Sequence, residues 1–144
     1  MPEDKLGPPA PVVLAMLMCD AIHQDAATRK CFLLGTFSTI NCRKFPAVHR
    51  QLAVHLVLTN GHGRAAIRLA LAPADESQAP LFTRDGTIEF GDPLSVAELN
   101  FIITNVTFNQ PGEYRLQVFG NNELLMERRL YVLEVQPQPP AEQA

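Results

Sequence analysis

Apolar residues occupy every second position in several short segments of this sequence. The clearest is Leu52–Thr59, where leucine and valine on one side of an extended chain alternate with alanine, histidine, valine and threonine on the other. Tyr114–Val118 alternates in the same way, with charged and amide side chains on its second face. A period of two indicates β-strands with one buried face, and no segment has a helical period of useful length. The sequence therefore predicts an all-β fold.

The spacing of the turns narrows the architecture. Turn residues recur about every ten positions, which is typical of antiparallel sandwiches and partly closed barrels. We expect an antiparallel, immunoglobulin-like β-sandwich of about seven to nine strands. The pattern does not fix the strand boundaries between Pro73 and Ser95. Strands are expected at residues 12–18, 31–38, 52–59, 65–72 and 98–108, with one or two within 81–90 and a closing hairpin within 109–135.

The closing hairpin bears on the type of sandwich. Gly112-Glu113-Tyr114, at the start of the penultimate expected strand, resembles the tyrosine corner of immunoglobulin-like domains, in which the phenol hydroxyl bonds to upstream backbone. The alternative is an ordinary core tyrosine at the start of a strand, and the pattern does not separate the two.

Two irregularities are also expected. Asn60-Gly61-His62-Gly63 predicts a hairpin turn, because Asn and Gly tolerate positive φ angles. Between Ile103 and Val106 the apolar residues change from odd to even positions. A β-bulge near Thr104 and Asn105 would produce this change of face.

Length and composition indicate one domain. The chain has 144 residues, of which 47% are hydrophobic, enough for a single core. We expect the sandwich at residues 12–135, between flexible tails at 1–11 and 136–144 that are rich in proline. The apolar run Val12–Met18 is too short to span a membrane.

Charge and cysteine content suggest the compartment and exclude some partners. A net charge of −3 gives no general attraction to nucleic acid or to an anionic membrane. The three cysteines are an odd number in a chain large enough to fold without disulfides. We therefore expect reduced thiols and a cytoplasmic protein.

The residues that most suggest a site are Cys19, His23, Cys31 and Cys42, because thiolates and imidazoles bind zinc. They lack a Cys-x-x-Cys pair, and Cys31 lies in an apolar segment where cysteine commonly packs as a small hydrophobe. A metal-binding module or metal-dependent enzyme built on these four residues is the alternative interpretation. The preferred interpretation assigns no metal, no cofactor and no catalytic residue.

Other reactive groups do not form a recognisable constellation. Asp20, Asp25, His23 and His55 offer acid and base groups, but carboxylates between strands more often cap turns. No serine occupies a Gly-x-Ser-x-Gly elbow, and residues 61–63 (GHG) are too few to cradle phosphate. We expect a non-enzymatic structural or protein-binding module.

Two surfaces are candidates for binding a protein. Arg115, Arg128 and Arg129 could form a basic patch across the closing hairpin, although pairing with Glu113, Glu123 and Glu127 is the preferred interpretation. The terminal strand Leu130–Val135 is apolar at nearly every position, and an edge position would favour self-association. The expected partner is an unknown protein or a second copy of the chain.

Residues 19–37 resemble the opening motif of an uncharacterised bacterial family of small cytoplasmic domains. The motif runs Cys-Asp, a polar turn ending in Gly-Lys, and Leu-x-Gly-x-aromatic, and it is matched here by Cys19-Asp20, Lys30 and residues 33–37 (LLGTF). Phe45-Pro46 leads into the next strand, as in that family. Arg29 stands where the family has glycine. The resemblance implies a fold and a compartment but no activity.

Overall fold

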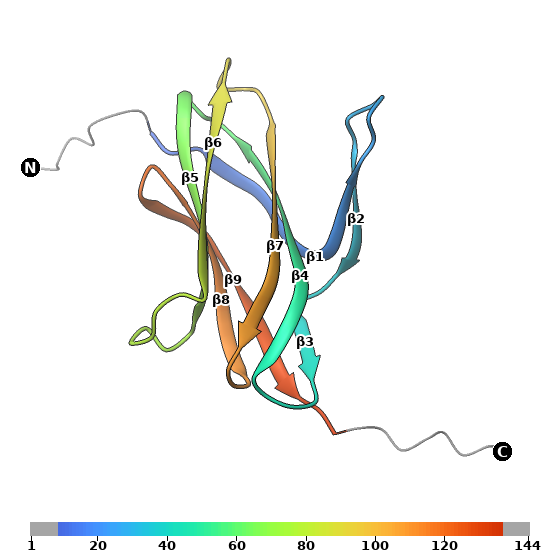
Figure 1. Cartoon of the computed structure of the whole chain (residues 1–144). Helices are drawn as coiled ribbons and strands as arrows, with labels where there is room; N and C mark the ends of the chain where they lie inside the picture. The colour runs from blue at the N-terminus through green and yellow to red at the C-terminus, as the bar shows by residue number, and fades with distance from the viewer. Residues whose placement is uncertain (1–8, 137–144) are drawn as a thin grey trace, which may run out of the picture.

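Two β-sheets face each other in the computed structural model, which describes residues 9–136 (Figure 1). The first sheet has the order β2-β1-β4-β7 and consists of β1 (Val12–Gln24), β2 (Cys31–Thr36), β4 (Ala47–Thr59) and β7 (Ala97–Phe108). The second has the order β3-β9-β8-β5-β6 and consists of β3 (Thr39–Cys42), β5 (Gly63–Pro73), β6 (Phe82–Phe90), β8 (Gly112–Gly120) and β9 (Glu123–Glu134). The predicted all-β sandwich is confirmed. Most of the two expected tails lies outside the described residues.

The core fills the space between the sheets, and the alternation seen in the sequence determines which side chains enter it. The inward positions of β4 and β8 are almost completely buried, as are those of β5. Side chains at successive strand positions point to opposite faces, so each strand contributes every second residue. The largest fully buried side chains include Phe108, Met18, Leu52, Leu56, Leu58, Ile67, Leu69, Leu71, Ile103, Leu116 and Leu130.

The strand order is that of an immunoglobulin-like sandwich. The neighbours β5-β8-β9 correspond to the C-F-G strands of such domains, and β4-β7 correspond to B and E. All pairs are antiparallel except β3 with β9. The turn at 60–63 therefore connects two sheets and does not close a hairpin between β4 and β5. The pattern could not reveal this, because the same turn residues serve both connections.

The terminal strand is not an edge strand, contrary to the expectation for Leu130–Val135. β3 pairs in parallel with β9, joining Thr39 to Tyr131 and Cys42 to Glu134. The strand β3 is only four residues long and shows no extended alternation. No pattern in the sequence therefore predicts β3, the strand that pairs with the outer edge of β9.

Tyr114 forms the tyrosine corner that the sequence suggested. Its hydroxyl donates a hydrogen bond to the carbonyl oxygen of Gln110 at 2.6 Å. The Tyr114 ring packs edge-to-face on Phe108, with 5.0 Å between the ring centroids. This contact links the start of β8 to the end of β7 and so fixes the connection between the two sheets.

The predicted change of face in β7 is present, but no extra residue produces it. Asn105 has a φ of 56°, and Ile103 and Val106 on either side of the change are both buried. In β4 the buried positions change phase at the facing residues Arg50 and Gln51, so the pairing register is the same on both sides. Two strands turn over together, which a single-strand pattern cannot distinguish from a bulge.

We expect Tyr114→Phe to lower the free energy of unfolding by about 1–2 kcal/mol, because it removes one partly buried hydrogen bond and leaves the carbonyl of Gln110 without this donor. Urea titration followed by circular dichroism measures the change. Tyr131→Phe is the control. Tyr131 is 38% exposed, so this substitution should change the free energy of unfolding little. Equal losses of unfolding free energy in the two variants would show that the corner hydrogen bond contributes no more than the hydroxyl of a partly exposed tyrosine.

Candidate functional site

The second half of β1 and the strand β2 form an arm that lies over the outer face of the first sheet. β1 pairs with β4 through Val12–Cys19 and with β2 through Cys19–Gln24. At this change of partner β1 bends, and the β1-β2 hairpin runs back beside β4 (Figure 1). Ala53 and His55 point away from the core, yet their exposed fractions are only 0% and 7%. The arm accounts for their burial.

The arm brings together a thiol, an imidazole and a carboxylate from three different strands. Cys31 begins β2, His55 lies on β4 and Glu98 lies on β7. Their ligand atoms all lie within 4.8 Å of one another. Within residues 9–136, this is the one group of three or more His, Cys, Asp or Glu side chains that lie close enough together to hold a metal ion.

Asn100 connects the group. Its Oδ1 lies 2.7 Å from Nδ1 of His55, and its Nδ2 donates a hydrogen bond to Sγ of Cys31 at 3.5 Å. The other imidazole nitrogen, Nε2, lies 3.4 Å from Oε1 of Glu98. His55 is thus held between two polar side chains of β7, and it is the one buried polar or charged residue of the described part of the chain.

The structure does not bring together the four residues that the sequence offered as metal ligands. Cys19 is fully buried and donates a hydrogen bond to the carbonyl of Ala21 at 3.4 Å, while Cys42 lies on β3 in the other sheet. Burial raises the pKa of both thiols, which favours their protonated forms. His23 is exposed, with its ring 6.0 Å from that of Phe32. Of the four, Cys31 alone belongs to the group with His55.

No local pattern in the sequence links His55 or Glu98 to Cys31. The sequence pattern indicated His55 only as one of several separate acid or base groups, and it did not indicate Glu98 as a ligand. Their proximity depends on the pairing of β4 with β7, in which His55 lies opposite Asn100, and on the arm that returns over both strands. Such long-range pairing cannot be read from local spacing.

The face of the arm that points away from the sheet is apolar. Phe32 and Leu34 alternate with the half-buried Cys31 and Leu33, and their exposed fractions are 52% and 53%. β2 is also the free edge of its sheet. Its sequence, CFLLGT, contains no charged residue and no proline.

The turn at the tip of the arm shows why glycine would be favoured at position 29, where this chain has Arg29. This residue has a φ of 64°, in the left-handed region where glycine is unstrained. The turn is held by Asp25, whose carboxylate accepts hydrogen bonds from the backbone N–H and the hydroxyl of Thr28 at 2.7 and 2.8 Å. These bonds lower the pKa of Asp25, the backbone bond most strongly. The turn geometry therefore favours glycine at position 29.

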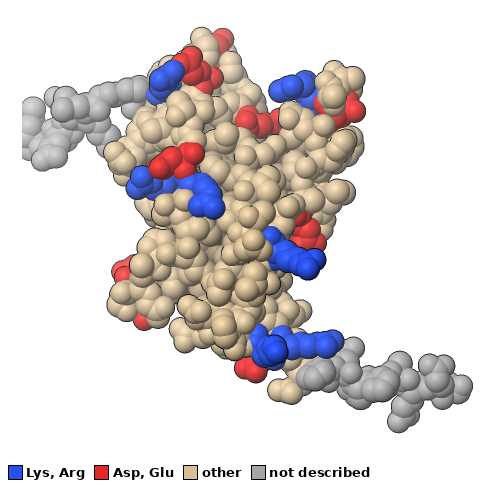
Figure 2. Space-filling view, in the orientation of Figure 1, with Lys and Arg blue, Asp and Glu red and all other residues tan. Residues whose placement is uncertain are grey.

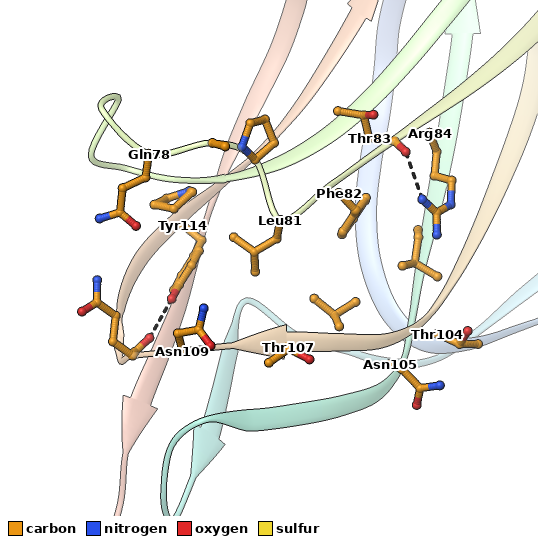
Figure 3. A pocket seen from close by; sticks show the side chains of 16 residues that line it. Gln78, Leu81, Phe82, Thr83, Arg84, Thr104, Asn105, Thr107, Asn109 and Tyr114 are labelled. Carbon is orange, nitrogen blue, oxygen red and sulfur yellow. Dashed lines mark hydrogen bonds between the residues drawn. The ribbon is translucent and has the colours of Figure 1, made fainter.

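A hollow opens between β6 and β7, the neighbouring edge strands of the two sheets. It has a volume of about 960 Å³, and Leu81, the residue before β6, points into it (Figure 3). The Tyr114 corner closes one end. Burial raises the pKa of the Tyr114 phenol, so it remains a hydrogen-bond donor. The polar groups around the opening are Gln78, Thr83, Arg84, Thr104, Asn105, Thr107, Asn109 and Gln110.

The arginines proposed as a basic patch are engaged within the molecule. Arg115 donates to Glu113 at 3.1 Å and to Glu127 at 3.4 Å, while Arg129 lies 3.9 Å from Glu113. Arg128 points toward the other sheet and donates to the carbonyl of Met16 at 2.7 Å. On the face shown in Figure 2, charged side chains form small groups of mixed sign.

Comparison with known proteins identifies a family. Residues 14–133 match the family described as "Family of unknown function (DUF6941)". This supports the resemblance to an uncharacterised family, whereas the motif itself and the bacterial origin stay predictions. No curated protein matches the chain. Within residues 9–136, no helix is long and apolar enough to cross a membrane.

Two solved structures show partial likeness. One is the alkylpurine DNA glycosylase AlkC of Pseudomonas fluorescens, bound to DNA containing an abasic site analog, with 10% identity and a TM-score of 0.46 over 66% of this chain. The other is a β-glucosidase from Kluyveromyces marxianus, with 11% identity and a TM-score of 0.43 over 72% of this chain. The matches cover only 27% and 15% of those chains. Likeness at this level carries no argument about activity.

We expect Arg29→Gly to raise the free energy of unfolding by about 0.5–1 kcal/mol, because relief of the left-handed strain exceeds the extra freedom that glycine has in the unfolded chain. Urea titration measures the difference. Ala27→Gly is the matched control, since Ala27 lies in the same turn without a positive φ, and it should lower stability. A loss of stability in both variants would contradict this account of the turn.

Proposed function

The chain belongs to DUF6941, a family of unknown function, and we propose that it is a non-enzymatic module that binds protein through edge strand β2, with a second copy of itself as the partner. The observation that carries this proposal is the uncharged free edge of β2. An edge strand presents unpaired backbone groups to any chain that can pair with it, and proteins usually guard such edges with charge or proline. Here neither guard is present.

The other edges are guarded. β6 carries Arg84, Asp85 and Glu89, and β7 carries Glu98 and turns over at Asn105. β3 also lacks charge but is only four residues long. β2 is therefore the edge whose chemistry best fits pairing with another strand.

A second copy fits this edge because the strand is complementary to itself. In antiparallel pairing centred on Leu33, Phe32 of each copy lies opposite Leu34 of the other. Both side chains are about half exposed in the single chain, and pairing would cover them from both sides of the interface. Because β2 has no charged residue, pairing brings no like charges together within the strand.

The hollow between β6 and β7 offers no catalytic constellation of its own. Its lining contains amides, hydroxyls and Arg84, but no carboxylate, imidazole or thiol among the described residues. General acid–base and nucleophilic chemistry usually depend on those groups. Compartment is also part of the proposal: the three cysteines are free, which supports a reducing environment such as the cytoplasm.

We expect the full chain to be a concentration-dependent dimer at tens of micromolar, measured by size-exclusion chromatography with light scattering. Phe32→Lys should shift it to monomer, because two copies would place lysines in the paired strands. Leu124→Lys is the control, since Leu124 is 48% exposed but lies on β9, and its variant should still dimerise.

Two results would overturn the proposal. One is a wild-type chain that stays monomeric up to hundreds of micromolar. The other is a dimer that Leu124→Lys weakens as much as Phe32→Lys, because the contact would then lie elsewhere. Thermal melts of all three proteins establish that each is folded.

A further inference from the structure

We infer that Cys31, His55 and Glu98 form a binding site for one divalent transition-metal ion of the zinc class. The ion would lie between the arm and strands β4 and β7. The inference does not depend on self-association through β2. It rests on the positions of the three ligand atoms and on the hydrogen bonds that surround them.

The three side chains supply a ligand set that zinc accepts. A tetrahedral zinc site uses thiolate, imidazole and carboxylate at about 2.0–2.3 Å, which places the ligand atoms roughly 3.3–3.8 Å apart. Here they already lie within 4.8 Å of one another, and Nε2 of His55 is 3.4 Å from Oε1 of Glu98. Small side-chain rotations would bring all three into contact with one ion.

The hydrogen bonds of His55 indicate what belongs between these groups. With the amide of Asn100 in this orientation, its Oδ1 can only accept, so Nδ1 of His55 donates their 2.7 Å hydrogen bond. In the neutral ring, Nε2 then presents a lone pair to the carboxylate of Glu98, and two acceptors face each other. A bound cation satisfies both. An imidazole whose second nitrogen donates to a carbonyl-type oxygen is also the usual arrangement of a metal-ligating histidine.

The charges and the softness of the ligands favour zinc over magnesium or calcium. A thiolate at Cys31 and the carboxylate of Glu98 together neutralise a divalent ion in this partly buried position. The amide of Asn100, 3.5 Å from Sγ, donates a hydrogen bond that stabilises a thiolate. Thiolate and imidazole ligands select zinc-like ions, whereas magnesium and calcium prefer oxygen.

The site is open to solvent on the side of Glu98. The side chain of Glu98 is 45% exposed, so ions and water reach the group from solvent. With three protein ligands, water completes the tetrahedron. The ion would tie the first residue of β2 to β4 and β7, and so fix the arm on the sheet.

Two arrangements of the same residues need no ion. A protonated imidazole would donate from its two nitrogens to Oδ1 of Asn100 and to Oε1 of Glu98. If the amide of Asn100 is rotated, its nitrogen donates to Nδ1 of His55, Nε2 donates to Glu98, and the thiol of Cys31 donates to Oδ1. All four groups would then be satisfied. Metal titration separates the metal site from both ion-free arrangements.

Cobalt provides the test, because a thiolate bound to Co²⁺ gives a charge-transfer band in the near ultraviolet. The probe is CoCl₂, titrated into the full chain without a histidine tag, after treatment with chelator and in a non-chelating reductant. We expect one equivalent to bind with this band, ZnCl₂ to displace it, and ZnCl₂ to raise the melting temperature. Phe32→Lys should bind the ion as the wild type does, which keeps this result separate from self-association.

Matched variants locate the ligands. Cys31→Ser should abolish the band, and Glu98→Gln should weaken binding at least tenfold. These two residues are partly exposed, so their variants should fold even if a variant of the buried His55 does not. Cys42→Ser, His23→Gln and Glu89→Gln should bind cobalt like the wild type. The inference is overturned if the wild type retains less than a tenth of an equivalent, or if the band persists in Cys31→Ser.

Discussion

Strand β4 has to be covered on both faces, and the rest of the architecture follows from this requirement. Its inward leucines and Val54 form the centre of the core, while Ala53 and His55 on the other face are also buried. An immunoglobulin-like sandwich leaves the outer face of each sheet open to solvent. Here the arm covers the part of the first sheet's outer face that includes Ala53 and His55. Strand β1 lies between β2 and β4 in the sheet, and its second half carries β2 back over β4.

The arm has two sides with different chemistry. Its inner side places Cys31 against His55 and Glu98, where a thiol, an imidazole and a carboxylate meet in a partly buried space. Its outer side presents Phe32 and Leu34 along an unpaired strand edge. A metal ion on the inner side would order the strand that carries the outer side. The two proposals therefore concern one structural element, although each is tested by a different measurement.

Local chemistry in the sequence predicted most of the sandwich. The period of two located β4, β5, β7 and β8, and the closing hairpin included β9. The turn before Tyr114 indicated the tyrosine corner. The pattern missed β3, because four residues are too few to show a period. It also missed the site on the arm, because Cys31 and His55 meet only through strand pairing. The candidate ligands chosen from sequence were neighbours along the chain, whereas Cys19 and Cys42 lie in different sheets.

Because β4 and β7 change face at facing residues, a change in the length of one strand there requires the same change in the other. Because Arg50 and Asn105 lie at the same level, the register that precedes the change is the register that follows it. Deleting Asn105 alone would make β7 alternate strictly from Ile103 to Phe108. Because β4 would keep its two successive outward residues, two residues of β4 would then oppose one of β7, as in a β-bulge. Removing Arg50 as well would restore the match. Relatives of this chain should therefore gain or lose residues at these two sites in pairs, and such paired gaps would identify the strand pairing from aligned sequences alone.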